Sequence, residues 1–148
     1  MAAATDRLRN FGFLVRDVYR LYAKHFERYV REIDLTLPQC KVLGHLSRNE
    51  GISQARLAEL TDTDPMTLVR TLDRMQQDAW IERRPDPEDR RAHRLYLRDA
   101  AKPVMQRMWK LADQARQEAL APLSVSEREQ LVELLERVQG ALLQLEPK

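Results

Sequence analysis

The stretch from Ser53 to Arg98 decides the fold of this chain; it reads SQARLAELTDTDPMTLVRTLDRMQQDAWIERRPDPEDRRAHRLYLR. Its patterns predict a helix, a short turn, a second helix, a strand, a basic loop and a second strand. That order is typical of a helix-turn-helix followed by a β-hairpin wing.

Asp64 and Pro65 mark the start of the second helix. The Asp64 carboxylate can accept hydrogen bonds from the free amides of the first turn, and proline is favoured at the first helical position. The apolar face that follows has helical spacing and consists of Leu68, Val69, Leu72 and Met75. The opposite face is polar and carries Thr67, Arg70, Thr71 and Arg74.

This polar face suits the floor of a DNA major groove. Arginine can pair bidentately with guanine there, and a threonine methyl can touch the thymine methyl. The alternative is an ordinary solvated helix surface. We therefore predict that this helix contacts DNA through Pro65, Met66, Thr67, Arg70, Thr71 and Arg74.

The helix before it is predicted to run from Ser53, a suitable N-cap and a further predicted DNA contact, to about Leu60. Thr61-Asp62-Thr63 has the length of the required turn, although the glycine often found there is absent. An earlier helix is predicted to start at its cap Thr36, and Ile52 is expected to add a short strand to the wing sheet.

Two strands are predicted to form the wing, Trp80–Arg83 and His93–Arg98. The second strand alternates, with Leu95 and Leu97 on its buried side. The loop between the strands spans 84–92 and contains two prolines, which stiffen it.

The segment from Arg83 to Arg94 holds five arginines and three acids. A guanidinium on a protruding loop suits a narrow minor groove, whose negative potential attracts it. Asp89 is expected to hold the side chain of Arg91 in an extended pose. The alternative is a solvated hairpin tip. The predicted DNA-binding residues of the wing are Arg84, Asp89, Arg90 and Arg91.

These motifs resemble, in order, those of the MarR family of winged-helix transcription regulators. The shared motifs are Leu37-Pro38-Gln39, Leu57-Ala58, Leu72-Asp73-Arg74-Met75, Trp80-Ile81-Glu82-Arg83 and Asp86-Pro87-Glu88-Asp89-Arg90-Arg91. The resemblance implies that Arg91 reaches the minor groove. The family usually has glycine where this chain has Ala79, so a left-handed helix end there costs about 1 kcal/mol. It also usually has threonine where this chain has Arg98.

The composition bounds the class of protein. The chain has 148 residues, of which 43% are hydrophobic and 32% charged, and its net charge is only +2, so DNA affinity must come from the placement of charge. The single cysteine, Cys40, excludes an internal disulfide and fits a reducing cytoplasm. No signal peptide or membrane helix is predicted.

Both termini are predicted to be helical. Thr5–Ile33 is amphipathic and long for a small domain, 100–121 follows the cap Asp99, and a leucine-rich helix opens at a capping box formed by Ser126 and Glu129. The fold class is therefore mostly α with a small β-hairpin wing. We expect a winged helix-turn-helix domain over 36–98 and a helical dimerisation region from 5–35 and 99–146. An intertwined homodimer would cover the exposed apolar faces, and the alternative is a monomeric bundle.

Several residues away from the predicted DNA contacts could have other functions. Tyr19, Tyr22 and His25 share a region of the first helix, and the resemblance implies a small aromatic or phenolic effector near that region; the alternative is core packing. Cys40 could sense oxidants, but its apolar neighbours favour a structural role. The histidines show no metal-ligand spacing.

No catalytic motif is recognisable, and neither an enzyme activity nor a cofactor or metal is predicted. The expected function is a sequence-specific, cytoplasmic transcription regulator, a ligand-responsive repressor that binds a pseudo-palindromic operator in double-stranded DNA as a dimer. The alternatives are a non-specific architectural DNA-binding protein and a winged-helix module for protein interaction.

Overall fold

The computed structural model describes residues 2–148, with side chains from residue 6 onward. The chain divides into two compact units, one ending at Ala112 and the other running from Asp113 to Lys148. The helices are α1 (Ala2–Arg9), α2 (Phe11–Arg31), α3 (Leu37–Leu46), α4 (Gln54–Thr61), α5 (Pro65–Gln77), α6 (Ala101–Ala119) and α7 (Val125–Leu145). The strands are β1 (Ile81–Pro85) and β2 (His93–Leu97). No helix within residues 2–148 is long and apolar enough to cross a membrane.

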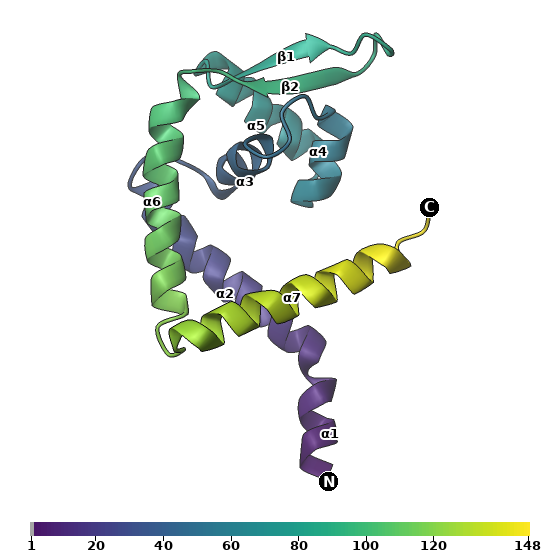
Figure 1. Cartoon of the computed structure of the whole chain (residues 1–148). Coiled ribbons are helices and arrows are strands. Elements are labelled where there is room, and N and C mark those ends of the chain that lie inside the picture. The colour runs from purple at the N-terminus through teal and green to yellow at the C-terminus, as the bar shows by residue number, and fades with distance from the viewer. Residues whose placement is uncertain (1) are drawn as a thin grey trace. The chain divides into compact units, whose positions relative to one another are not determined.

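The predicted fold class is confirmed, because the chain is mostly helical and carries one antiparallel hairpin. In the hairpin Ile81 pairs with Leu97, and Pro85 with His93. Figure 1 shows the hairpin beside α4 and α5, with its loop at the end away from the start of α6. β1 starts one residue later than predicted because the Trp80 amide still donates to the Met75 carbonyl at the end of α5 (2.9 Å).

One hydrophobic core joins the helices of the first unit to the hairpin. The apolar face predicted for the second helix of the helix-turn-helix, α5, supplies Leu68, Leu72 and Met75, each no more than 1% exposed. The hairpin adds Ile81 and Leu95, both fully buried. The other members include Val42, Leu43, Leu46, Leu57, Ala101, Val104 and Met108. Burial of these side chains is the main force that holds α5 against its neighbours.

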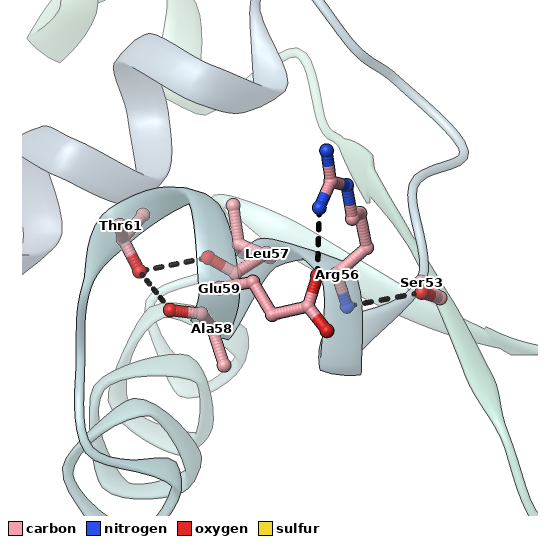
Figure 2. Close-up of polar contacts among 6 residues, drawn as sticks. All are labelled: Ser53, Arg56, Leu57, Ala58, Glu59 and Thr61. Atoms are coloured by element: carbon pink, nitrogen blue, oxygen red, sulfur yellow. Dashed lines mark hydrogen bonds and ion pairs between the residues drawn. The ribbon is translucent and has the colours of Figure 1, made fainter. Parts of the chain in front are cut away.

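Short polar side chains start and end α4, as Figure 2 shows. The Ser53 hydroxyl accepts the Arg56 amide at 3.1 Å, which confirms the predicted N-cap. At the other end the Thr61 hydroxyl donates to the Leu57 carbonyl at 2.8 Å. Asp62 then adopts a left-handed backbone, with φ +47°, in the turn that contains no glycine. An aspartate tolerates this conformation better than most residues do, so the turn forms without glycine.

The segment before α4 is built largely as predicted. Thr36 caps α3 in a capping box with Gln39, and Pro38 lies in the first turn. The segment after α3 pairs with β2 at a single bridge between Ser53 and Arg94, so Ile52 does not form a full strand. The Ile52 carbonyl nevertheless accepts the Leu95 amide at 3.0 Å.

Two predicted helix boundaries are wrong. The continuous helix expected over Thr5–Ile33 is interrupted at Asn10, and α2 ends at Arg31. Asparagine has a low helix propensity, and Gly12 follows two residues later, so an interruption there costs little.

The last helix also starts earlier than predicted. Ser124, not Ser126, is its N-cap; the Ser124 hydroxyl accepts the Glu127 amide at 3.2 Å, and Glu127 accepts the Ser124 amide at 2.9 Å. The Ser124 amide lowers the pKa of Glu127, because it stabilises the carboxylate. The sequence contains two overlapping Ser-x-x-Glu patterns, and the prediction took the second.

Candidate nucleic-acid interface

The recognition helix α5 presents its polar face to solvent. Asp64 caps it by accepting the Thr67 amide at 3.1 Å, and Pro65 occupies the first turn, as predicted. The Thr71 hydroxyl donates to the Thr67 carbonyl at 2.8 Å, so its hydrogen is used within the helix. The predicted contacts that are exposed on this helix are Pro65, Met66, Thr67, Arg70 and Arg74, while Thr71 is half-buried.

The two arginines of this face differ in whether an acidic side chain lies beside them. The guanidinium of Arg74 lies 3.6 Å from Asp78, with 71% of its side chain exposed. Arg70 forms no ion pair with any residue whose side chain the structure describes. The Arg70 side chain can therefore change its orientation without first leaving an acidic partner.

One predicted DNA-binding residue of the wing, Arg84, packs against the hairpin itself. Arg84 lies over the Tyr96 ring, with 3.9 Å from its guanidinium carbon to the ring centroid, and it also pairs with Glu82. Such a cation–π contact fixes the side chain on the outer face of the hairpin. Arg90 and Arg91 remain exposed at the tip.

Asp89 orders the wing tip differently from the prediction. Its carboxylate accepts the backbone amide of Arg91 at 3.0 Å, and among the described side chains no ion pair joins these two residues. This bond is an Asx-type turn, in which an aspartate satisfies an amide two residues ahead. Asp89 therefore shapes the backbone on which Arg91 stands and leaves the Arg91 guanidinium free.

Asp86 closes the base of the same loop. Its carboxylate accepts the Glu88 amide at 3.0 Å and lies 3.2 Å from Arg94 Nε. The Glu88 amide and, less strongly, the Arg94 charge hold the pKa of Asp86 below its usual value. The loop is thus a bonded turn rather than a loose tip.

A groove of about 500 Å³ separates the helix-turn-helix from the wing. Ser53 lies at its α4 edge, Pro65 at its α5 edge, and Asp89 and Arg91 at its wing edge. Residues that the sequence placed in two separate motifs therefore border one groove.

The predicted effector residues are only partly brought together. Tyr19 and Tyr22 line a cavity of about 210 Å³ together with Phe26, Lys41 and Trp109. His25 is not among the lining residues and packs edge-on against Tyr29, with 5.2 Å between ring centroids. Sequence reasoning missed Phe26 and Trp109, although Phe26 follows Tyr22 by four positions and so shares its helix face.

Cys40 also borders this cavity and is only 6% exposed. Burial raises the pKa of the Cys40 thiol to about 12. The thiolate is the reactive form of cysteine, so this environment favours the structural role over the oxidant sensor. No group of three potential metal ligands occurs among the described residues.

The exposed polar face of α5 beside a basic hairpin defines a winged-helix DNA-binding protein. The profile of the MarR family matches residues 33–92. A probable transcriptional regulator from Pseudomonas aeruginosa is 30% identical, with 86% of this chain and 96% of that chain covered and a TM-score of 0.70. The chain therefore belongs to the MarR family of winged-helix transcription regulators.

Two further solved structures are similar over most of the chain. A mutant MarR from E. coli complexed with operator DNA is 26% identical, covers 90% of this chain and 96% of its own, and has a TM-score of 0.73. BpsR from Bordetella bronchiseptica, whose DNA binding is regulated by 6-hydroxynicotinic acid, is 25% identical, with coverage of 88% and 98% and a TM-score of 0.75.

Proposed function

We propose that this protein is a sequence-specific repressor that binds a pseudo-palindromic operator as a homodimer and is released by a small aromatic or phenolic effector. Residues 36–98 would form the DNA-binding domain, and 5–35 with 99–146 the dimerisation region. The protein would act in the cytoplasm, where the Cys40 thiol stays reduced.

The common surface of α5 and the wing carries this proposal. Pro65 and Arg91 border one groove, and Arg70 and Arg90, each next in sequence to a residue that lines it, are exposed. In the proposed complex α5 enters the major groove, where Arg70 and Thr71 meet base edges. Arg91 enters the neighbouring minor groove and senses its width. The complex of the related E. coli protein with operator DNA supports operator binding by this chain.

The dimer is supported by apolar side chains that lack cover. In the first unit α2 exposes, among others, Phe13 (72%) and Leu14 (62%). In the second unit none of the residues of α7 is buried, although the helix contains six leucines. Such patches mark interaction surfaces in proteins, and a second copy of this chain carries the same patches.

The effector proposal rests on the cavity beside Tyr22 and Trp109. Its lining is almost wholly apolar and aromatic, with one cationic group, Lys41. An aromatic ring would stack among the aromatic side chains, and a carboxylate or phenolate would face Lys41. The regulation of BpsR by 6-hydroxynicotinic acid supports an effector of this kind. The ligand must favour a conformation with displaced recognition helices, and a coupling of about 1–3 kcal/mol would suffice.

A gel shift with the DNA upstream of the protein's own gene tests the function. We expect a discrete complex of two chains per duplex that persists over random competitor DNA. Inserting five base pairs between the half-sites should abolish it, because the half-sites would then face opposite sides of the duplex. Binding no tighter than to random DNA, or indifference to the insertion, would contradict the proposal.

A further inference from the structure

Arg83 is the wing arginine that points inward. It lies opposite Leu95 in the hairpin, whose side chain is fully buried, and only 16% of its own side chain is exposed. Arg84, the next residue, points to the other face and contacts Tyr96. The alternation of a strand therefore separates two adjacent arginines, one turned to the outer face and one turned to the recognition helix.

The guanidinium of Arg83 joins the wing to both helices of the helix-turn-helix. Nη1 donates to Asp73 Oδ1 and to Gln76 Oε1, each at 2.8 Å. Nη2 donates to the Val69 carbonyl at 3.4 Å, and Nε donates to Gln54 Oε1 of α4 at 3.3 Å. Arginine suits this position because its planar fork offers several donors at fixed angles, which a lysine ammonium cannot reproduce.

The three partners on α5 lie on one line along the helix. Val69, Asp73 and Gln76 are spaced at i, i+4 and i+7, so they share one stripe of its surface. Arg70 and Arg74 each follow a member of this stripe by one residue and therefore lie about 100° round the helix. A contact along the stripe opposes rotation of α5 about its own axis, and that rotation decides where Arg70 points.

Small rotations matter at a base edge. A side chain on the rim of a helix about 5–6 Å in radius moves by about 1 Å when the helix turns by 10°. A recognition site needs its groups held to within about 0.5 Å and 10–20°. The apolar core sets the depth of α5, and the hydrogen bonds from Arg83, which weaken steeply when their angles change, add a directional restraint on its rotation.

We infer that Arg83 is a positioning residue for base discrimination. It holds α5 at the rotation in which Arg70 and Thr71 meet the bases, and it does so from the wing without contacting DNA itself. This inference rests on the proposed function, and it assigns a role to an arginine that the sequence grouped with the basic loop.

The test compares Arg83→Lys with wild type on two duplexes. One is selected by the wild-type protein from a random library, and the other is a random sequence of the same length. We expect the ratio of the two affinities to fall about tenfold, comparable to the loss of one base contact. The affinity for the random duplex and its salt dependence should stay unchanged. Arg98 is an exposed arginine that directly follows β2, so Arg98→Lys is the matched control. It should change neither the affinity ratio nor the affinity for the random duplex.

Other roles for Arg83 predict different results. A phosphate contact would weaken binding to both duplexes and lower the salt slope by about one. A merely structural role would lower both affinities together with the melting temperature. Asp73→Ala removes one of the four acceptors of Arg83, so it should lower the affinity ratio in the same direction but by less than Arg83→Lys, and the double variant should lose less than the sum of the two single losses. An unchanged affinity ratio in Arg83→Lys would overturn the inference.

Amide exchange gives a readout that needs no DNA. In Arg83→Lys the amides of α5 should exchange faster than in wild type, while those of α3 keep their rates. Equal exchange in α5 would overturn the inference even if DNA binding changed. A wild-type protein that prefers no sequence would overturn the proposed function and, with it, base discrimination by Arg83; that outcome is visible before any variant is measured.

Discussion

Asp86 Oδ2 lies 3.2 Å from Arg94 Nε across the base of the wing loop. The other oxygen of the same carboxylate accepts the Glu88 amide at 3.0 Å. One side chain thus ties the first residues of the loop to the second strand and to the loop backbone. Because Arg90 and Arg91 belong to this loop, the Asp86 contacts determine how rigidly the backbone that carries them is held.

The wing should loosen at low pH. The pKa of Asp86 is lowered in the folded protein, so its contribution to stability is present above the unfolded pKa of about 3.9 and is lost as the pH falls through the folded pKa. We expect a wing-specific shift of backbone amide resonances below pH 4, recorded by NMR. Asp86→Asn should remove that titration step; a wing titration that survives the substitution would assign it to another carboxyl group.

Ala79→Gly should stabilise the protein. Ala79 adopts φ +59° at the end of α5, a left-handed conformation in which its Cβ is strained. We expect the free energy of unfolding, measured in urea, to rise by about 1 kcal/mol. Asp62→Gly, at φ +47°, is the control and should gain less, because aspartate tolerates this region. A loss of stability in Ala79→Gly would show that strain is not the dominant effect there.

Cys40 should react slowly. Since burial raises its pKa to about 12, far less of the thiol is ionised near neutral pH than in an ordinary exposed cysteine. A thiol reagent such as DTNB should therefore label the native protein far more slowly than the urea-unfolded protein. Peroxide treatment should leave DNA binding unchanged, whereas rapid native labelling with loss of DNA binding would revive the sensor role.

Lys41 should select acidic effectors. Trp109 lines the cavity, and in a Trp80→Phe background it is the only tryptophan, so its emission can report binding. Benzoate-type acids should shift this emission, and Lys41→Met should weaken them about fivefold, as expected for a partly exposed ion pair worth about 1 kcal/mol. A neutral phenol serves as the control ligand and should bind both proteins equally. Equal weakening of both ligands would mean that Lys41 shapes the cavity rather than binding charge.

Local patterns predicted the winged-helix part of the fold well. Asp64 and Ser53 cap their helices, and Leu95 is buried in its strand, because each feature depends on residues close in sequence. The predictions failed where two local patterns competed, as with Ser124 and Ser126. They also failed at Asn10, where a residue of low helix propensity interrupts an otherwise helical pattern.

The candidate site was harder to predict than the fold. Arg83 and Arg84 are identical in type and adjacent, yet one lies against α5 and the other over Tyr96. Their roles depend on the strand register, which cannot be predicted from the number of charged residues in the segment. Trp109 reaches the cavity from α6, a helix far away in sequence from Tyr22, so nothing local links the two residues.

The affinities of wild type and Arg70→Ala for a selected and a random duplex test the central claim most directly. We predict that wild type prefers the selected duplex by a factor of about 10³ or more. Arg70→Ala should lose about 1–3 kcal/mol of binding on the selected duplex and almost none on the random one. Equal weakening on both duplexes would contradict base reading by α5 and indicate an architectural binder, and the absence of salt-dependent DNA binding would indicate a protein-interaction module.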